Sequence, residues 1–270
     1  MFKLFKLNYL IVLLAFSISI ASAQDSNLNS FQNGSIKAIG VSAEKQSKYV
    51  ALKTALIIAQ RNLLEKVKGV SLYNLTQMKN SKITSDIIHT RVQGLIVGAQ
   101  SCGEKYFEDK GYAEVCLQMP LHGHGGVFDV IYPVIKEYVP AEVPYRPLTP
   151  MKKNQSRPFD GLIVDVRHHL SFQPAIINRI IDHHGRTVYD PSMISHKLMM
   201  EAGPVQFATT RAKAEAILSD TGSVHPLFIR SENIKSHTDV VVSSKDAEKI
   251  YLNNLQSNML HRAHVVFLLQ

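Results

Sequence analysis

The chain has 270 residues, of which 45% are hydrophobic and 19% charged, and its formal net charge is +8. This is a globular composition, which excludes a disordered chain. With two cysteines, 14 glycines and 11 prolines, the chain is neither a disulfide-dense miniature scaffold nor a collagen-like or low-complexity polymer.

The first 23 residues have the pattern of a secretory signal peptide. Lys3 and Lys6 precede an apolar run over residues 9–20, which is shorter than the about 20 residues that a membrane-spanning helix needs. Small residues at the −3 and −1 positions end the run, and polar residues follow. We expect cleavage between Ala23 and Gln24, with an uncleaved N-terminal anchor as the alternative.

The position of the cysteines bears on how the exported protein is held in the envelope. A bacterial lipoprotein needs a cysteine just after the apolar run, and the chain has cysteines at positions 102 and 116 alone. We therefore expect an exported protein of the periplasm, peripheral to the outer membrane where it contacts that membrane, and not lipid-anchored. The polar residues 24–34 are expected to be mobile.

A strand followed by a helix opens the next segment. Alternating residues over 35–41 predict the strand, and a stripe at steps of three and four predicts a helix that ends near Gly69. The stripe consists of Leu52, Leu56, Ala59, Leu63 and Val67. Beside it, Ala51, Ala55 and Ala59 form a ridge of small residues that lets a helix lie close to a sheet. Asn62 lies near this ridge, and we expect its amide to bond to backbone.

Residues 94–107 and 112–119 predict a hairpin, with an uncertain helix or irregular connection over residues 81–92 before it. If the loop is residues 108–110, then Phe107 faces Gly111 and Cys102 faces Cys116 on the polar side of the hairpin. In an oxidising compartment this pair is expected to form a disulfide. A reactive thiol pair is the weaker alternative, because the spacing is not Cys-x-x-Cys and no basic group is adjacent.

Prolines divide the chain after this hairpin. The apolar stretch 127–139 is broken by Pro133, and residues 140–158 contain Pro140, Pro144, Pro147 and Pro150. We expect an α+β fold of two mixed sheet-and-helix domains, residues 35–139 and 159–270, joined by the Pro-rich linker 140–158.

The second half predicts a buried strand at 161–166 and a hairpin over 175–189 that turns at 182–185. Further strands are expected over 202–210, 226–229, 238–242 and 264–269. Helices are expected over 211–218 and over 245–259, the latter capped at its N-terminus by Ser244.

The first half resembles a known family. Small residues at helical spacing over 51–69, the run Gly94-Leu-Ile-Val-Gly-Ala99 and the hairpin at Gly111 are similar to the LPP-twenty family of bacterial envelope proteins, which includes small outer-membrane lipoproteins. The same features resemble the N-terminal domain of flagellar assembly proteins of the FlgT type. The resemblance covers about residues 35–126. This sequence departs from the lipoprotein members of the family because it lacks their lipidated cysteine.

The second half resembles a C-terminal domain attached to such proteins, for which no activity is established. The residues that carry this resemblance are 161–165, 174–175, 185–189 and 241–247. The resemblance implies no catalytic residues and no cofactor.

Twelve histidines are the most unusual feature of the composition, and six of them form close pairs. The pairs are His122 with His124, His168 with His169, and His183 with His184. Imidazole is a common metal ligand, so zinc or copper binding is one hypothesis. Solvent-facing turn histidines are the simpler interpretation, since neighbours such as His168 and His169 point to opposite faces of a continuing strand.

Asp160, Asp165 and Asp182 are candidates for paired acid–base chemistry, which requires two carboxyl groups with separated pKa values. Asp165 ends a predicted strand and Asp182 begins a predicted turn, so turn and ion-pair roles are favoured. The sequence contains no nucleophile elbow, zinc-protease helix, phosphate loop or dinucleotide fingerprint.

The leading hypothesis is a non-enzymatic envelope protein that mediates assembly or outer-membrane association, with flagellar basal-body components among its partners by resemblance alone. This interpretation also includes weak contact with anionic envelope polymers, self-association and no binding of nucleic acid. The alternatives are a metal-binding or hydrolytic enzyme that uses Asp165, Asp182 and nearby histidines, and a module that binds cell wall or a small ligand.

Overall fold

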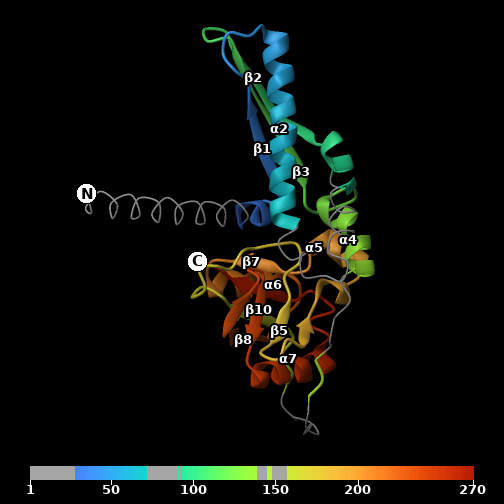
Figure 1. Ribbon diagram of the computed structural model, residues 1–270. Helices are drawn as coiled ribbons and strands as arrows, with labels where there is room; N and C mark the ends of the chain where they lie inside the picture. Colours follow the sequence, from blue (N-terminus) through green and yellow to red (C-terminus); the bar gives the residue numbers. More distant parts are fainter. Residues whose placement is uncertain (1–27, 72–89, 92, 139–144, 148–156) are drawn as a thin grey trace, which may run out of the picture.

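The computed structural model describes residues 28–71, 90–91, 93–138, 145–147 and 157–270 (Figure 1). The described residues contain both helices and three separate β-sheets, which confirms the predicted α+β class. The predicted cleavage site between Ala23 and Gln24, the connection 81–89 and most of the linker 140–158 lie outside the described residues. In the part of the chain that is described, no helix has the length and apolar character required to cross a membrane.

The N-terminal unit is a three-stranded antiparallel sheet, ordered β1-β3-β2, with a long helix lying along one face (Figure 1). Its elements are β1 (Ser35–Val41), α2 (Lys48–Ser71), β2 (Gln100–Phe107) and β3 (Tyr112–Pro120). Alternate residues of β3 are buried against α2, as the period of two predicts.

The buried stripe of α2 differs from the predicted one. Its members recur at steps of four and are fully buried: Ala51, Ala55, Ala59, Leu63 and Val67. The ridge of small residues therefore faces the sheet itself, and Leu56, at the margin of this stripe, is 37% exposed. Gly40 of β1 makes this close approach possible, since a Cβ there would lie 2.1 Å from the Ala55 carbonyl oxygen.

Side chains of α2 also cover the free edge of β1. Asn62 donates its amide Nδ2–H to the Ile39 carbonyl (2.8 Å), and Lys66 Nζ donates to the Lys37 carbonyl (2.8 Å). The backbone bond expected for Asn62 is therefore present. Edge strands expose unpaired backbone groups, and these two side chains satisfy the carbonyls of β1.

The hairpin differs from the prediction by one position in its register. Phe107 pairs with Tyr112 instead of Gly111, and a bulge between Ser101 and Gly103 then brings Cys102 beside Cys116. The two cysteines form a disulfide, with Cα atoms 5.0 Å apart. The loop is longer than expected because Gly111, at φ +66°, belongs to the turn.

Residues 94–97 are helical, which corrects the predicted strand start at Gly94. The strand β2 begins only at Gln100. The Gly98 N–H bonds to the Leu95 carbonyl and Ile96 is buried in the core, so a helical turn satisfies both the backbone and the apolar side chain.

The C-terminal part contains two four-stranded sheets. The first is ordered β7-β11-β4-β8 with all strands parallel, and the second is ordered β6-β5-β10-β9 and is mixed. The first consists of β4 (Gly161–Asp165), β7 (Gln206–Ala208), β8 (Pro226–Arg230) and β11 (Val265–Leu268). The second consists of β5 (Ile180–Asp182), β6 (Thr187–Tyr189), β9 (Asn233–Lys235) and β10 (Asp239–Val242).

Helices cover these sheets. Helix α6 (Arg211–Asp220) packs on the parallel sheet, and α7 (Ser244–Ser257) packs on the mixed one. Ser243, one residue before the predicted cap, is the N-cap of α7, because its hydroxyl accepts from the Asp246 N–H. The predicted strand 202–210 is shortened to β7, since α5 (His196–Ala202) occupies its start.

Two segments assigned to other parts of the chain pack against residues of the C-terminal part. Residues 28–32, expected to be mobile, form a helical turn in which Leu28 is buried and Phe31 lies against Phe207 (ring centroids 4.8 Å apart). Helix α4 (Val127–Tyr138), placed by sequence in the domain 35–139, contacts α5 and the short 3-10 helix η2 (Pro191–Met193).

Helix α4 also continues through Pro133, where a break was predicted. Proline has no backbone N–H to donate to the carbonyl four residues earlier. For Pro133 that carbonyl lies in the first turn of the helix, so only one hydrogen bond near the helix start is lost. Burial of the apolar face compensates for it: Phe128, Ile131, Val134 and Ile135 are all buried.

Candidate functional site

The predicted histidine pairs lie at three separate places. His168 and His169 follow the end of β4, and their rings are 3.9 Å apart. The argument that they face opposite sides applies only if the strand continues past Arg167, and this condition is not met, because β4 ends at Asp165. His183 and His184, in the β5–β6 turn, are also 3.9 Å apart.

Within the described ranges, no group of three or more histidine, cysteine, aspartate or glutamate side chains has an arrangement that could hold a metal ion. His124 and His196 both contact Asp129, at 3.2 and 2.7 Å, and this contact joins α4 to α5.

The candidate carboxylates are engaged by fixed partners. Asp165 accepts two bonds from the Arg167 guanidinium, at 2.9 and 2.7 Å. Asp182 accepts from Arg186 Nε at 2.7 Å and from backbone N–H groups of its own turn. Asp160 accepts from the Ser223 hydroxyl and from two backbone N–H groups, so all three carboxylates have turn or ion-pair roles.

The pKa values of these groups move in one direction. Arg167 lowers the pKa of Asp165. Burial raises the pKa of Asp182, but hydrogen bonds from Arg186 and the turn outweigh burial, and the net pKa is lowered. Asp165 and Asp182 therefore both stay ionised at neutral pH, whereas an acid–base pair needs one raised and one lowered pKa.

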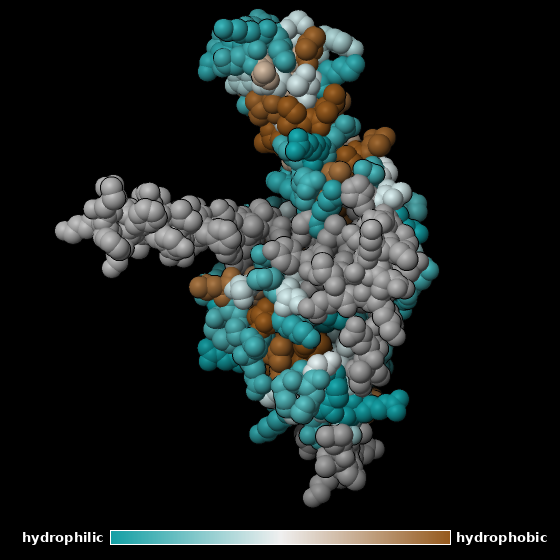
Figure 2. All heavy atoms as spheres, viewed as in Figure 1, coloured by the Kyte–Doolittle hydropathy of each residue, from teal (hydrophilic) through white to brown (hydrophobic). Residues whose placement is uncertain are grey.

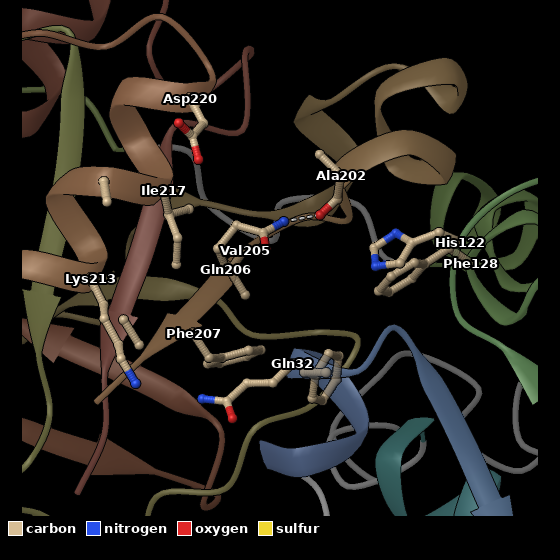
Figure 3. Close-up of a pocket in the computed structure, with 13 residues that line it drawn as sticks. Gln32, His122, Phe128, Ala202, Val205, Gln206, Phe207, Lys213, Ile217 and Asp220 are labelled. Carbon is tan, nitrogen blue, oxygen red and sulfur yellow. Dashed lines mark hydrogen bonds between the residues drawn. The ribbon is translucent and has the colours of Figure 1, made fainter. Parts of the chain in front are cut away.

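A cavity of about 450 Å³ lies where residues 28–32, α4, α5, β7 and α6 meet (Figure 3). Its walls are aromatic and aliphatic: Phe31, His122, Phe128, Val205, Phe207 and Ile217. Its polar side chains are Gln32, Gln206, Lys213 and Asp220. Apolar walls with a few placed polar groups are typical of small-ligand sites.

His122 forms one wall of this cavity. Its ring lies 5.1 Å from the Phe128 ring, and Gly203 leaves room for that phenyl ring, since a Cβ at position 203 would lie 2.9 Å from Phe128 Cε2. Burial lowers the pKa of His122, and a contact with the Met200 carbonyl offsets only part of this effect. The imidazole is thus neutral at pH 7, and its buried Nδ1 has no hydrogen-bond partner among the described residues.

One face of α6 forms the opposite wall. Lys213, Ala216, Ile217 and Asp220 recur at the helical spacing of three and four residues, so they share that face (Figure 3). Lys213 lies in the first turn and Asp220 at the last residue. This order opposes the helix macrodipole, which favours acidic groups at the N-terminus and basic groups at the C-terminus.

Sequence reasoning did not find this cavity. Its lining comes from three stretches that are distant along the chain, residues 31–32, 122–128 and 202–220, and Phe31 belongs to a stretch that was expected to be mobile. Of the residues singled out by sequence, only His122 lies in the cavity. The spacing of Lys213 and Asp220 on a predicted helix is the one local signal that points to it.

Comparison with known proteins adds one similarity. Residues 161–270 match the family model described as Treponema pallidum Tp0624, second domain. The match spans β4 to β11 and includes β7 and α6 of the cavity, whereas His122 and residues 28–32 lie outside it. No curated protein matches the chain.

Proposed function

We propose that this protein is an exported, non-enzymatic protein of the cell envelope that acts by binding, with the cavity between residues 28–32, β7 and α6 as its ligand site. The observation that carries the proposal is the contrast between the cavity and the carboxylates. The side chains of Lys213 and Asp220 line the cavity and have no hydrogen-bond or ion-pair partner among the described residues, while Asp160, Asp165 and Asp182 are held by internal partners.

The envelope location rests on the leader pattern and on the paired cysteines. Disulfides persist in oxidising compartments, and Cys102 and Cys116 are bonded across the β2–β3 hairpin. A protein released by cleavage after Ala23 into the periplasm fits both features.

The outer face of α2 supports association with other envelope components. Val50, Leu56 and Ile57 are exposed there, and Figure 2 shows apolar side chains over the upper part of this helix. Lys53 and Arg61 flank them, so the face combines apolar and cationic groups. An anionic envelope surface complements such a face.

The binding proposal is tested by blocking the cavity. Ala216→Trp places an indole in the cavity, whereas Ala212→Trp makes the same change on an exposed position of α6 outside the lining. We expect anilinonaphthalene sulfonate, a fluorophore of apolar sites, to bind the native protein and the Ala212→Trp variant but not the Ala216→Trp variant. Equal binding by all three proteins contradicts the proposal.

The location is tested separately in a Gram-negative host. N-terminal sequencing of the protein from the periplasmic fraction is expected to begin at Gln24, and recovery of the full-length chain from the cytosol contradicts export. Release of the protein from isolated envelopes by increasing salt is expected if the cationic face of α2 contributes, because salt screens exposed charges.

A further inference from the structure

The cavity runs along an unpaired sheet edge. Among the residues that the structure describes, β7 is the last strand of the parallel sheet and pairs only with β11. Gln206 and Phe207 point to opposite faces of that strand, yet both line the cavity (Figure 3). A cavity reached from both faces of a strand lies at its edge.

Backbone hydrogen-bonding groups of β7 face this edge. The Ala208 carbonyl accepts from the Leu269 N–H, so the N–H and C=O of residue 208 point to β11 in the parallel register. Those of Phe207, one residue earlier, consequently point away from β11. They present one donor and one acceptor to an incoming extended chain, which is the basis of strand addition.

The two charges of α6 define the ends of a ligand. Lys213 and Asp220 are seven residues apart on one helix face, a rise of about 10 Å, which is about the length of three extended residues. The cation lies at the helix N-terminus and the anion at the C-terminus, so the macrodipole and the side chains favour the same ligand polarity at each end. That polarity is a carboxylate beside Lys213 and an ammonium group beside Asp220.

We propose that the cavity binds a short peptide of about three residues with free ends, extended and parallel to β7. This inference rests on the proposed binding function and names its ligand class. The direction follows from the topology, because α6 begins just after β7 ends, and Lys213 lies toward the C-terminal end of the strand (Figure 3). A ligand with its carboxylate at Lys213 therefore extends the parallel sheet by one strand.

The apolar walls fit small side chains between the charged ends. Ala216 and Ile217 lie between Lys213 and Asp220 on α6, and Phe31 and Phe207 pack ring to ring on the other side. A cavity of about 450 Å³ accommodates alanine-sized residues. Both protein fragments and cell-wall peptides have this chemistry.

The first test measures binding of L-Ala-L-Ala-L-Ala by calorimetry, together with its N-acetyl and C-amide forms. We expect each capped form to bind about fivefold more weakly. Lys213→Gln is expected to abolish the preference for the free carboxylate and keep that for the free amine, and Asp220→Asn to do the reverse. Lys245→Gln and Glu232→Gln, at exposed positions outside the cavity, are expected to keep both preferences.

The second test is hydrogen exchange with and without the tripeptide. Strand addition is expected to slow exchange of the Phe207 N–H, whereas the Gln206 and Ala208 N–H groups already bond to β11 and change little. A peptide N-methylated at its central residue is expected to lose this protection. Binding without protection of Phe207 contradicts the strand-addition geometry.

The outcomes separate this inference from the function on which it rests. If Ala216→Trp blocks the fluorophore but no peptide binds, or if capped and free peptides bind equally, the peptide inference is overturned and the binding function stands. If Ala216→Trp does not affect the fluorophore, the binding function itself fails. A D-alanyl-D-alanine-ended tripeptide that binds more tightly than the all-L form assigns the ligand to the cell wall; the opposite order assigns it to protein fragments.

Discussion

Gly40 of β1 and Ala59 of α2 are in contact at the backbone: a Cβ on Gly40 would lie 2.2 Å from the Ala59 nitrogen. No side chain fits there without moving the helix from the sheet. We expect Gly40→Ala to lower the free energy of unfolding by about 3 kcal/mol, at the upper end of the range for overpacked cores, measured by urea denaturation.

The matched control is Gly94→Ala. A Cβ on Gly94 meets nothing within 4 Å, and the residue is helical, where alanine is the better helix former. We expect this variant to be as stable as the native protein or slightly more so. Equal loss of stability in both variants would show that the contact between Gly40 and α2 is not the cause.

The disulfide between Cys102 and Cys116 closes a loop with a sequence separation of 14. Replacing both cysteines by serine is expected to lower the free energy of unfolding by about 3 kcal/mol, because the unfolded chain gains the entropy that the bridge removed. A thiol titration of the native, unreduced protein is expected to count no free sulfhydryl. A count of two refutes the bridge.

Most of the elements follow from local patterns in the sequence. The period of two located β1 and β3, and small-residue spacing located α2, since each pattern reflects burial of one face. The errors arose where tertiary contacts decided the outcome. Leu56 was assigned to the buried stripe because it is apolar, whereas the sheet selects the alanine ridge. Pro133 was expected to break the apolar stretch 127–139, which instead forms a continuous helix with a buried face.

The cavity was beyond the reach of such patterns. Phe31, His122 and Phe207 meet only because the sheets bring distant segments together, and the all-parallel order β7-β11-β4-β8 cannot be deduced from the order of strands in the chain. The hairpin register shows the same limit on a smaller scale. The bulge at Cys102 compensates for a turn that is one residue longer than its sequence indicated.

Asp129 holds α4 against α5. Its carboxylate accepts from the Gly125 N–H at 2.8 Å and contacts His196 Nε2 at 2.7 Å, and the His196 ring stacks on Tyr132. We expect Asp129→Asn to lower the free energy of unfolding by about 1–2 kcal/mol, measured by urea denaturation. A neutral amide would then replace the charged carboxylate that contacts both the Gly125 N–H and His196 Nε2. Asp109→Asn, in the exposed β2–β3 turn, is the control and is expected to have no effect.

Asp190 makes stability depend on pH in an unusual direction. The residue is fully buried, and burial raises its pKa. Oδ1 accepts from the Ser192 N–H at 2.7 Å, whereas Oδ2 has no hydrogen-bond partner among the described residues. Hydrogen bonds from Ser192 and, to a smaller extent, the charge of Arg179 lower this pKa and offset only part of the effect of burial.

The sign for Asp190 follows from proton binding. The folded carboxyl keeps its proton to a higher pH than the unfolded one, so its contribution is complete below the ordinary aspartate pKa and is lost as pH rises through the folded pKa. Asp190→Asn keeps an oxygen acceptor for Ser192 and removes this titration. In urea denaturation from about pH 3 to pH 8, we expect the variant to gain stability relative to the native protein as pH rises.

Asp165, at the end of β4 in the parallel sheet, provides the opposite case. Arg167 lowers its pKa, so its contribution is present above the ordinary aspartate pKa and is lost as pH falls through the folded pKa. Asp165→Asn is therefore expected to be less stable than the native protein at neutral pH, with a difference that shrinks in acid. If the two variants shift with pH in the same direction, one of the two causes is refuted, since they require opposite slopes: a shared rise refutes control of Asp165 by Arg167, and a shared fall refutes control of Asp190 by burial.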